Sequence, residues 1–87
     1  MHETGIVRAL VKKLEETARQ SGAVRISAVS VWLGALSQFS AGHFREHFEE
    51  EAAGTVAQDA RLGIEVSDDA RDPDAHHVII RSVDLEI

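Results

Sequence analysis

The first three residues of the chain, Met1, His2 and Glu3, gather a dense set of groups that bind metal ions. With Met1 as the first residue, this leader offers a free amine, two backbone amides, an imidazole and a carboxylate. One interpretation is a leader that binds a metal ion. The plainer interpretation is one apolar and two polar residues in front of a helix. The residue types alone leave both interpretations open.

The remaining histidines also form pairs. His43 and His47 are four residues apart in a predicted helix, a spacing at which two imidazoles can share one metal ion. No third ligand is evident, so the sequence favours a pair that merely flanks the apolar stripe of that helix. His76 and His77 lie in an acidic segment. Adjacent side chains at the start of a strand point to opposite faces, so these two seldom bind one ion.

Motifs of catalysis are not evident. The chain has no cysteine, and none of its serines lies in a Gly-x-Ser-x-Gly turn of the kind that exposes a nucleophile. Its glycines are scattered rather than grouped in a phosphate-binding loop. The acidic run Glu49–Glu51 fits the solvated face of a helix. We therefore do not expect an enzyme.

Composition narrows the class of protein further. With 87 residues, 44% of them hydrophobic and 28% charged, the chain fits one small globular domain. A net charge of −6 argues against nucleic acid as a partner, because phosphate binding needs a cationic surface. No apolar run is long enough to span a membrane, and Glu3 stands where a signal peptide would be basic. We expect a cytoplasmic protein that does not bind membranes.

The pattern of apolar residues predicts two helices and three strands in the order α-β-α-β-β. Thr4 is the expected cap of the first helix, which ends near Gln20 before Ser21-Gly22. Ser40 is the expected cap of the second helix, and Gly54 ends it. The strands are expected at residues 23–36, 60–67 and 78–87, with a loop between the last two.

These elements predict an α+β fold, a small three-stranded sheet packed with two helices. The first strand is apolar on both faces in its second half, as in a central or doubly covered strand. The last strand is expected to return antiparallel beside the strand before it. In the first strand, strict alternation places four residues on one face, namely Val24, Ile26, Ala28 and Trp32, and three on the other, namely Val29, Val31 and Leu33. In the last two strands the apolar residues alternate with polar ones and face the core; they are Leu62, Ile64, Val66, Val83, Leu85 and Ile87.

Six short motifs follow one another in a recognisable order. They are Met1-His2-Glu3; Gly34, Leu36 and Ser37; Phe48-Glu49; Gly54-Thr55; Ala60 and Leu62; and Ile64-Glu65. In this order they resemble the HypA/HybF family of nickel metallochaperones, which serve hydrogenase maturation and, in some organisms, urease maturation. The resemblance covers residues 1 to about 66 and, more loosely, the last strand.

The resemblance implies a carrier that holds Ni²⁺ at Met1, His2 and Glu3 and delivers it to a hydrogenase or urease maturation pathway. A HypB-type GTPase or other hydrogenase maturation proteins would be its partners. The Met1 amine and His2 amide would close one chelate ring and the His2 imidazole a second, while Glu3 completes or borders the site. Bulky His2 should keep Met1 from being removed. Capture should weaken below about pH 7, because an amine and an imidazole have reference pKa values of about 8 and 6.5.

The chain also departs from the family pattern. The family normally carries a zinc ribbon with two Cys-x-x-Cys pairs between the last two strands, whereas here a cysteine-free loop at 67–77 stands in its place. We therefore expect a single domain over 1–87, without structural Zn²⁺. Glu46 and His47 replace an aromatic and a small residue. The alternative function is a protein-interaction, adaptor or regulatory module that keeps the fold without delivering nickel, with self-association into a homo-oligomer through Trp32 or Phe39.

Overall fold

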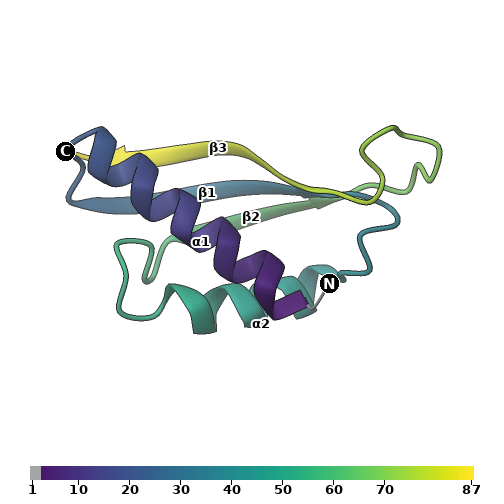
Figure 1. Ribbon diagram of the computed structural model, residues 1–87, viewed down its shortest axis with the longest axis horizontal. Coiled ribbons are helices and arrows are strands. Elements are labelled where there is room, and N and C mark those ends of the chain that lie inside the picture. Colours follow the sequence, from purple (N-terminus) through teal and green to yellow (C-terminus); the bar gives the residue numbers. More distant parts are fainter. Residues whose placement is uncertain (1–2) are drawn as a thin grey trace.

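The computed structural model of the chain describes residues 3–87 and, from Thr4 onward, their side chains. It contains two helices and three strands in the predicted order (Figure 1). These elements are α1 (Glu3–Gln20), β1 (Arg25–Leu33), α2 (Ala41–Ala52), β2 (Arg61–Val66) and β3 (Val78–Glu86). Both helices lie on one side of the sheet, which gives the α+β architecture expected from the sequence.

The strand order in the sheet is β2-β1-β3. β1 is central, which is one of the two positions that its apolar faces left open, and β2 runs parallel to it after the crossover through α2. The expectation that β3 pairs with β2 was wrong, because β3 pairs antiparallel with β1. The crossover places β2 on one edge of β1, so the other edge of the most apolar strand is the one left for β3 to cover.

A β-bulge in β1 breaks the strict alternation assumed from the sequence. The pairing with β3 shifts between Ile26 and Ala28, so Ser27 is the extra residue on β1. This shift turns Ile26 toward the helices together with Val29, rather than toward the opposite face. Trp32 does lie on the face away from the helices, where the Arg81 guanidinium carbon is 5.3 Å from the centre of its ring.

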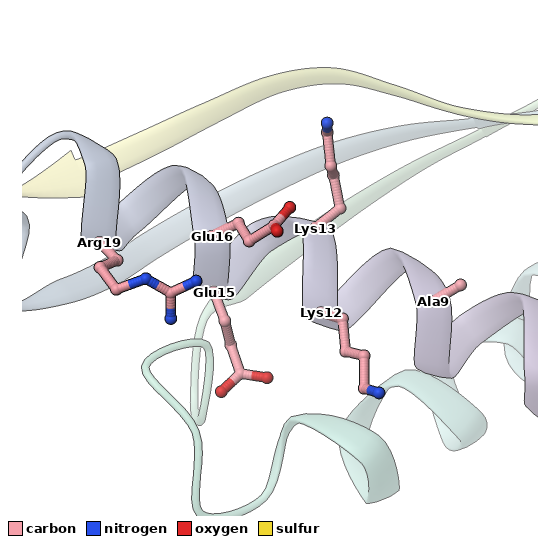
Figure 2. Close-up of a pocket in the computed structure, with 6 residues that line it drawn as sticks. All are labelled: Ala9, Lys12, Lys13, Glu15, Glu16 and Arg19. Carbon is pink, nitrogen blue, oxygen red and sulfur yellow. The ribbon is translucent and has the colours of Figure 1, made fainter.

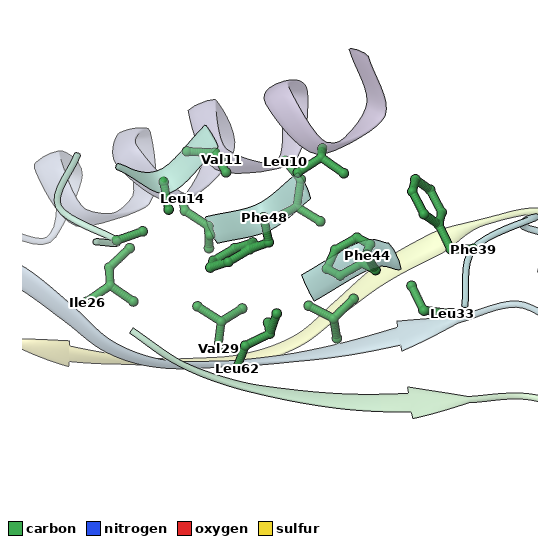
Figure 3. Packing of buried hydrophobic residues seen from close by; sticks show 14 of the residues in the cluster. Leu10, Val11, Leu14, Ile26, Val29, Leu33, Phe39, Phe44, Phe48 and Leu62 are labelled. Atoms are coloured by element: carbon green, nitrogen blue, oxygen red, sulfur yellow. The ribbon is translucent and has the colours of Figure 1, made fainter. Parts of the chain in front are cut away.

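The core lies between the two helices and the sheet (Figure 3). α2 contributes Phe44 and Phe48, whose rings are 6.3 Å apart, and Phe39 meets Phe44 edge to face at 5.3 Å. The stripe on α1 is fully buried and consists of Val7, Leu10, Val11, Leu14 and Ala18. Burying a side chain of this kind stabilises the fold by roughly 2 kcal/mol.

Three apolar residues expected on buried faces are exposed instead. Val24, Val66 and Ile87 have exposed fractions of 71%, 51% and 82%. Val24 precedes β1, Val66 ends β2 and Ile87 follows β3, so each lies at the end of a strand, where fewer neighbours cover it. Thr4 is likewise not a cap, because α1 already begins at Glu3. Helix limits shift easily by one residue, since the apolar stripe does not mark the first turn.

The loop at 67–77 is fastened to the end of β1. Gly34 N–H donates to the His77 carbonyl at 2.9 Å, and Leu36 N–H donates to the Ala75 carbonyl at 2.7 Å. Ala75 is buried. Asp72 accepts from the Asp74 backbone N–H at 2.8 Å, so aspartates of this segment act as turn formers.

Candidate metal site at the start of the two helices

The predicted nickel ligands lie at the very start of the chain. Met1 and His2 fall outside the residues that the structure describes, and Glu3 is the first residue of α1 with no described side chain. The structure does place the rest of the first turn of α1, from Thr4 onward.

α1 and α2 begin at the same end of the molecule and run in the same general direction (Figure 1). The Nε atom of Arg8 in α1 donates to Oε1 of Glu51 in α2 at 3.1 Å. One helical turn from this ion pair toward the helix starts lie Thr4 in α1 and His47 in α2. His43 lies one further turn along. No local spacing in the sequence signals this ion pair, which joins residues far apart in the chain.

The His43 and His47 side chains meet on the surface of α2. Their Nε2 atoms are 3.0 Å apart and their ring centres 4.7 Å apart. His43 is exposed, His47 is half-buried, and the Phe39 ring centre is 6.1 Å from that of His43. The pair therefore flanks the phenylalanine stripe, as the plainer interpretation predicts, and also brings two imidazole nitrogens together.

The position of this pair follows from how α2 is fixed. The Ser40 hydroxyl accepts from the His43 backbone N–H at 3.1 Å, so the predicted cap is in place and His43 belongs to the first turn. The Arg45 guanidinium donates to the Leu62 carbonyl at 3.0 Å and ties α2 to β2. With Phe44 in the core, the neighbouring face that carries the two histidines is turned to the surface.

The loop histidines form a weaker arrangement. His77 Nδ1 is 3.2 Å from Asp74 Oδ1, within the exposed loop itself. His76 is exposed. Among the side chains that the structure describes, from Thr4 to Ile87, no group of three or more histidines, aspartates or glutamates gathers as a metal site would require. The loop pair therefore fits a turn contact better than a metal centre.

A hollow on the outer surface of α1 does not resemble a ligand site. This hollow, shown in Figure 2, has a volume of about 400 Å³ and runs along the outer face of α1 between side chains of both charges. Its lining residues are Ala9, Lys12, Lys13, Glu15, Glu16 and Arg19. All six come from a single helix, so nothing encloses a bound molecule there. Among the described residues, neither helix is long and apolar enough to cross a membrane.

The sequence matches the family described as "HypA: Hydrogenase/urease nickel incorporation, metallochaperone, hypA" over residues 1–71. Hydrogenase maturation factor HypA of Chlorobium limicola is 38% identical over 65 residues, 75% of this chain and 56% of that protein. The protein of the same name from a Roseiflexus species is also 38% identical over 65 residues, 75% of this chain and 53% of that protein. The chain thus spans little more than half the length of these curated relatives.

Solved structures show the same fold. The solution structure of the Ni metallochaperone HypA from Helicobacter pylori superposes with a TM-score of 0.83 at 22% identity, covering 99% of this chain and 98% of that one. The solution structure of a second HypA protein gives 0.74 at 24% identity, covering 98% and 96%. The family match over most of the chain and the identity to these relatives agree with the resemblance found in the motifs. The chain belongs to the HypA family of hydrogenase and urease nickel-incorporation metallochaperones.

Proposed function

We propose that this protein is a nickel carrier that holds Ni²⁺ at Met1, His2 and Glu3 and delivers it during hydrogenase or urease maturation. The observation that carries the proposal is the match to a nickel-incorporation family from residue 1, where the Met-His-Glu leader stands. The ion is cargo, and a site at the very start of the chain, ahead of the buried stripe of α1 that begins at Val7, can release it without opening the core.

The partners belong to the same proposal. A HypB-type GTPase or another hydrogenase maturation protein would receive the ion, in the cytoplasm. The chain acts as one domain over 1–87, with the cysteine-free loop at 67–77 where the family has a zinc ribbon and with no structural Zn²⁺. Self-association through Trp32 or Phe39 finds no support, because both side chains are buried within the chain.

The proposal is tested by replacing one ligand. In calorimetric titration of the untagged chain with Ni²⁺, His2→Ala should remove tight binding while the circular dichroism spectrum stays unchanged. The physical reason is that the imidazole closes the second chelate ring, and without it the amine and amide hold the ion weakly. His76→Ala removes an imidazole from the loop and serves as the matched control, which should bind like the unaltered protein.

The amine is tested separately by adding one residue in front of Met1. The extension moves the amine out of the chelate ring, so binding should fall about as far as in His2→Ala. If the extended chain binds Ni²⁺ as tightly as the untagged one, the amine is not a ligand and the leader site is wrong. Full binding by His2→Ala would lead to the same conclusion.

A further inference from the structure

β3 forms an edge of the sheet whose outward backbone groups face away from β1 (Figure 1). At the two ends of β3, the carbonyls of His77 and Glu86 accept from the residues just after and just before β1, at 2.9 Å and 2.8 Å. Counting alternately from both ends, the residues whose backbone N–H and C=O groups point outward are Val78, Ile80, Val83 and Leu85. In the part of the chain that the structure describes, β1 is the only strand beside β3, so no strand pairs with these groups.

The opposite edge of the sheet is partly closed by a side chain. Ser67 N–H donates to the Leu33 carbonyl at 2.9 Å, so alternate residues counted back from Ser67 face β1, and Leu62 faces outward. The Arg45 guanidinium occupies that outward Leu62 carbonyl at 3.0 Å. β2 has six residues and β3 has nine. β3 therefore offers the larger surface for a further strand.

Apolar side chains follow the same edge. Four half-buried side chains, which we call the edge row, pack against the core from its outer side; they belong to Val78, Ile80, Val83 and Leu85. In the central strand, by contrast, Val29 and Val31 have exposed fractions of 2% and 0%. A strand added beside β3 covers the edge row and takes up the outward-facing hydrogen bonds at the same time, which is how an open sheet edge recruits another chain.

The bulge and the charges of β3 suit a second copy of the same strand. The pairing with β1 shifts by one residue in mid-strand, so Arg81 is the extra residue of β3 and divides the edge row into two pairs. A second, antiparallel β3, related by a two-fold axis at this bulge, places Ile80 opposite Val83 of the second copy and keeps like faces together. Arg81 and Asp84 both lie on the face away from the helices. Arg81 of each copy then lies diagonally across from Asp84 of the other, within reach of a long side chain.

We propose that two copies of this chain pair through their β3 strands, antiparallel, into one continuous sheet with the two edge rows in contact. The two-fold axis repeats the contact between Arg81 and Asp84, so both ends of the interface carry opposite charges. Nickel takes no part in this contact, so the inference stands or falls independently of the proposed function. A single strand edge is a small interface, so monomer and dimer should exchange reversibly with protein concentration.

The first test uses the unaltered, metal-free protein. Sedimentation velocity should show a dimer whose share grows with protein concentration. Amide hydrogen exchange, followed by NMR, locates the contact: the outward-facing amides of the edge row should exchange more slowly as the concentration rises. The amide of Ile79 faces β1 and should exchange slowly at every concentration.

The second test exchanges the charges. Arg81→Asp and Asp84→Arg each place like charges across the interface, so each variant alone should sediment as a monomer. An equimolar mixture of the two variants restores opposite charges in both contacts and should dimerise again. Glu65→Arg reverses the charge of an exposed acidic residue of β2 and is the matched control, which should dimerise like the unaltered chain. Circular dichroism melts show that each variant is folded.

Each outcome decides the proposal. A monomer at every concentration overturns it and leaves the β3 edge to an extended segment of another protein. A dimer that survives in both charge variants, or a mixture that stays monomeric, also overturns it, because the contact then lies elsewhere. If a charge variant fails to fold, the exchange rates of the edge row in the unaltered chain decide alone.

Discussion

Ser40 determines where α2 begins and, with it, where the two histidines lie. Its hydroxyl accepts from the backbone N–H of His43, so the residue that caps the helix holds the first of the two imidazoles in place. An uncapped helix leaves that N–H without an intrahelical partner, and its first turn frays. A single side chain thus connects the stability of α2 with the geometry of the candidate site.

Ser40→Ala should lower the free energy of unfolding by about 1 kcal/mol, because the cap hydrogen bond is lost. Ser40→Gly should cost only a few tenths of that amount, since glycine is itself tolerated at this position. Urea denaturation followed by circular dichroism measures both. Ser82→Ala, an exposed serine of β3, is the matched control and should change little. An equal loss in Ser40→Ala and Ser82→Ala would mean that the cap contributes nothing.

At the scale of the elements, the position of the loop at 67–77 depends on Gly34, which has no side chain. A Cβ atom at Gly34 would overlap the backbone of Ala75, whose carbonyl also accepts a hydrogen bond from Leu36. The obstacle is backbone rather than the end of a flexible side chain, so the loop itself would have to shift. Glycine is required at position 34 because the backbone of the loop packs directly against its Cα atom.

Gly34→Ala should therefore destabilise the fold by about 1–3 kcal/mol, the usual cost of overpacking. Gly42→Ala is the control in α2, where an added Cβ meets nothing within 4 Å. That substitution should be neutral or stabilising by up to about 1 kcal/mol, because alanine favours the helix. Thermal and urea unfolding of the two variants measure the difference. Equal stability of the two variants would show that the loop moves without cost.

The elements also show what sequence patterns can and cannot predict. The order of helices and strands and the Ser40 cap depend on local patterns, and they were predicted correctly. The two apolar faces of β1 left open whether it is central or covered on both sides, and the sheet order shows that it is central. The partner of β3 and the bulge beside Ile26 depend on which strand edges remain available after the crossover, a relation between distant segments. For the same reason, a spacing of four residues placed His43 and His47 on one face without predicting how closely their nitrogens meet.

For the whole molecule, the source of stability is an apolar core to which every helix and strand contributes. The two helices cover one face of the sheet, and the side chains between them are buried to within a few per cent. The chain has no cysteine and hence no disulfide. A zinc ribbon, by contrast, takes its folding free energy from the metal, because its ligands come together only when the ion binds.

Chelation should therefore leave the melting temperature of the purified protein unchanged. EDTA removes metal ions from solution. The described residues contain no cluster of three or more metal-ligating side chains on which the fold could depend. Added Ni²⁺ should instead raise the melting temperature, since a ligand that binds only the folded state stabilises it by about 2.7 kcal/mol at 100 times its Kd. Circular dichroism melts with EDTA, without additions and with excess Ni²⁺ measure both effects. His2→Ala should abolish the nickel effect and keep the EDTA result. Unfolding by EDTA would instead show that the fold needs a metal, and the Asp74–His77 pair would be the first place to look for it.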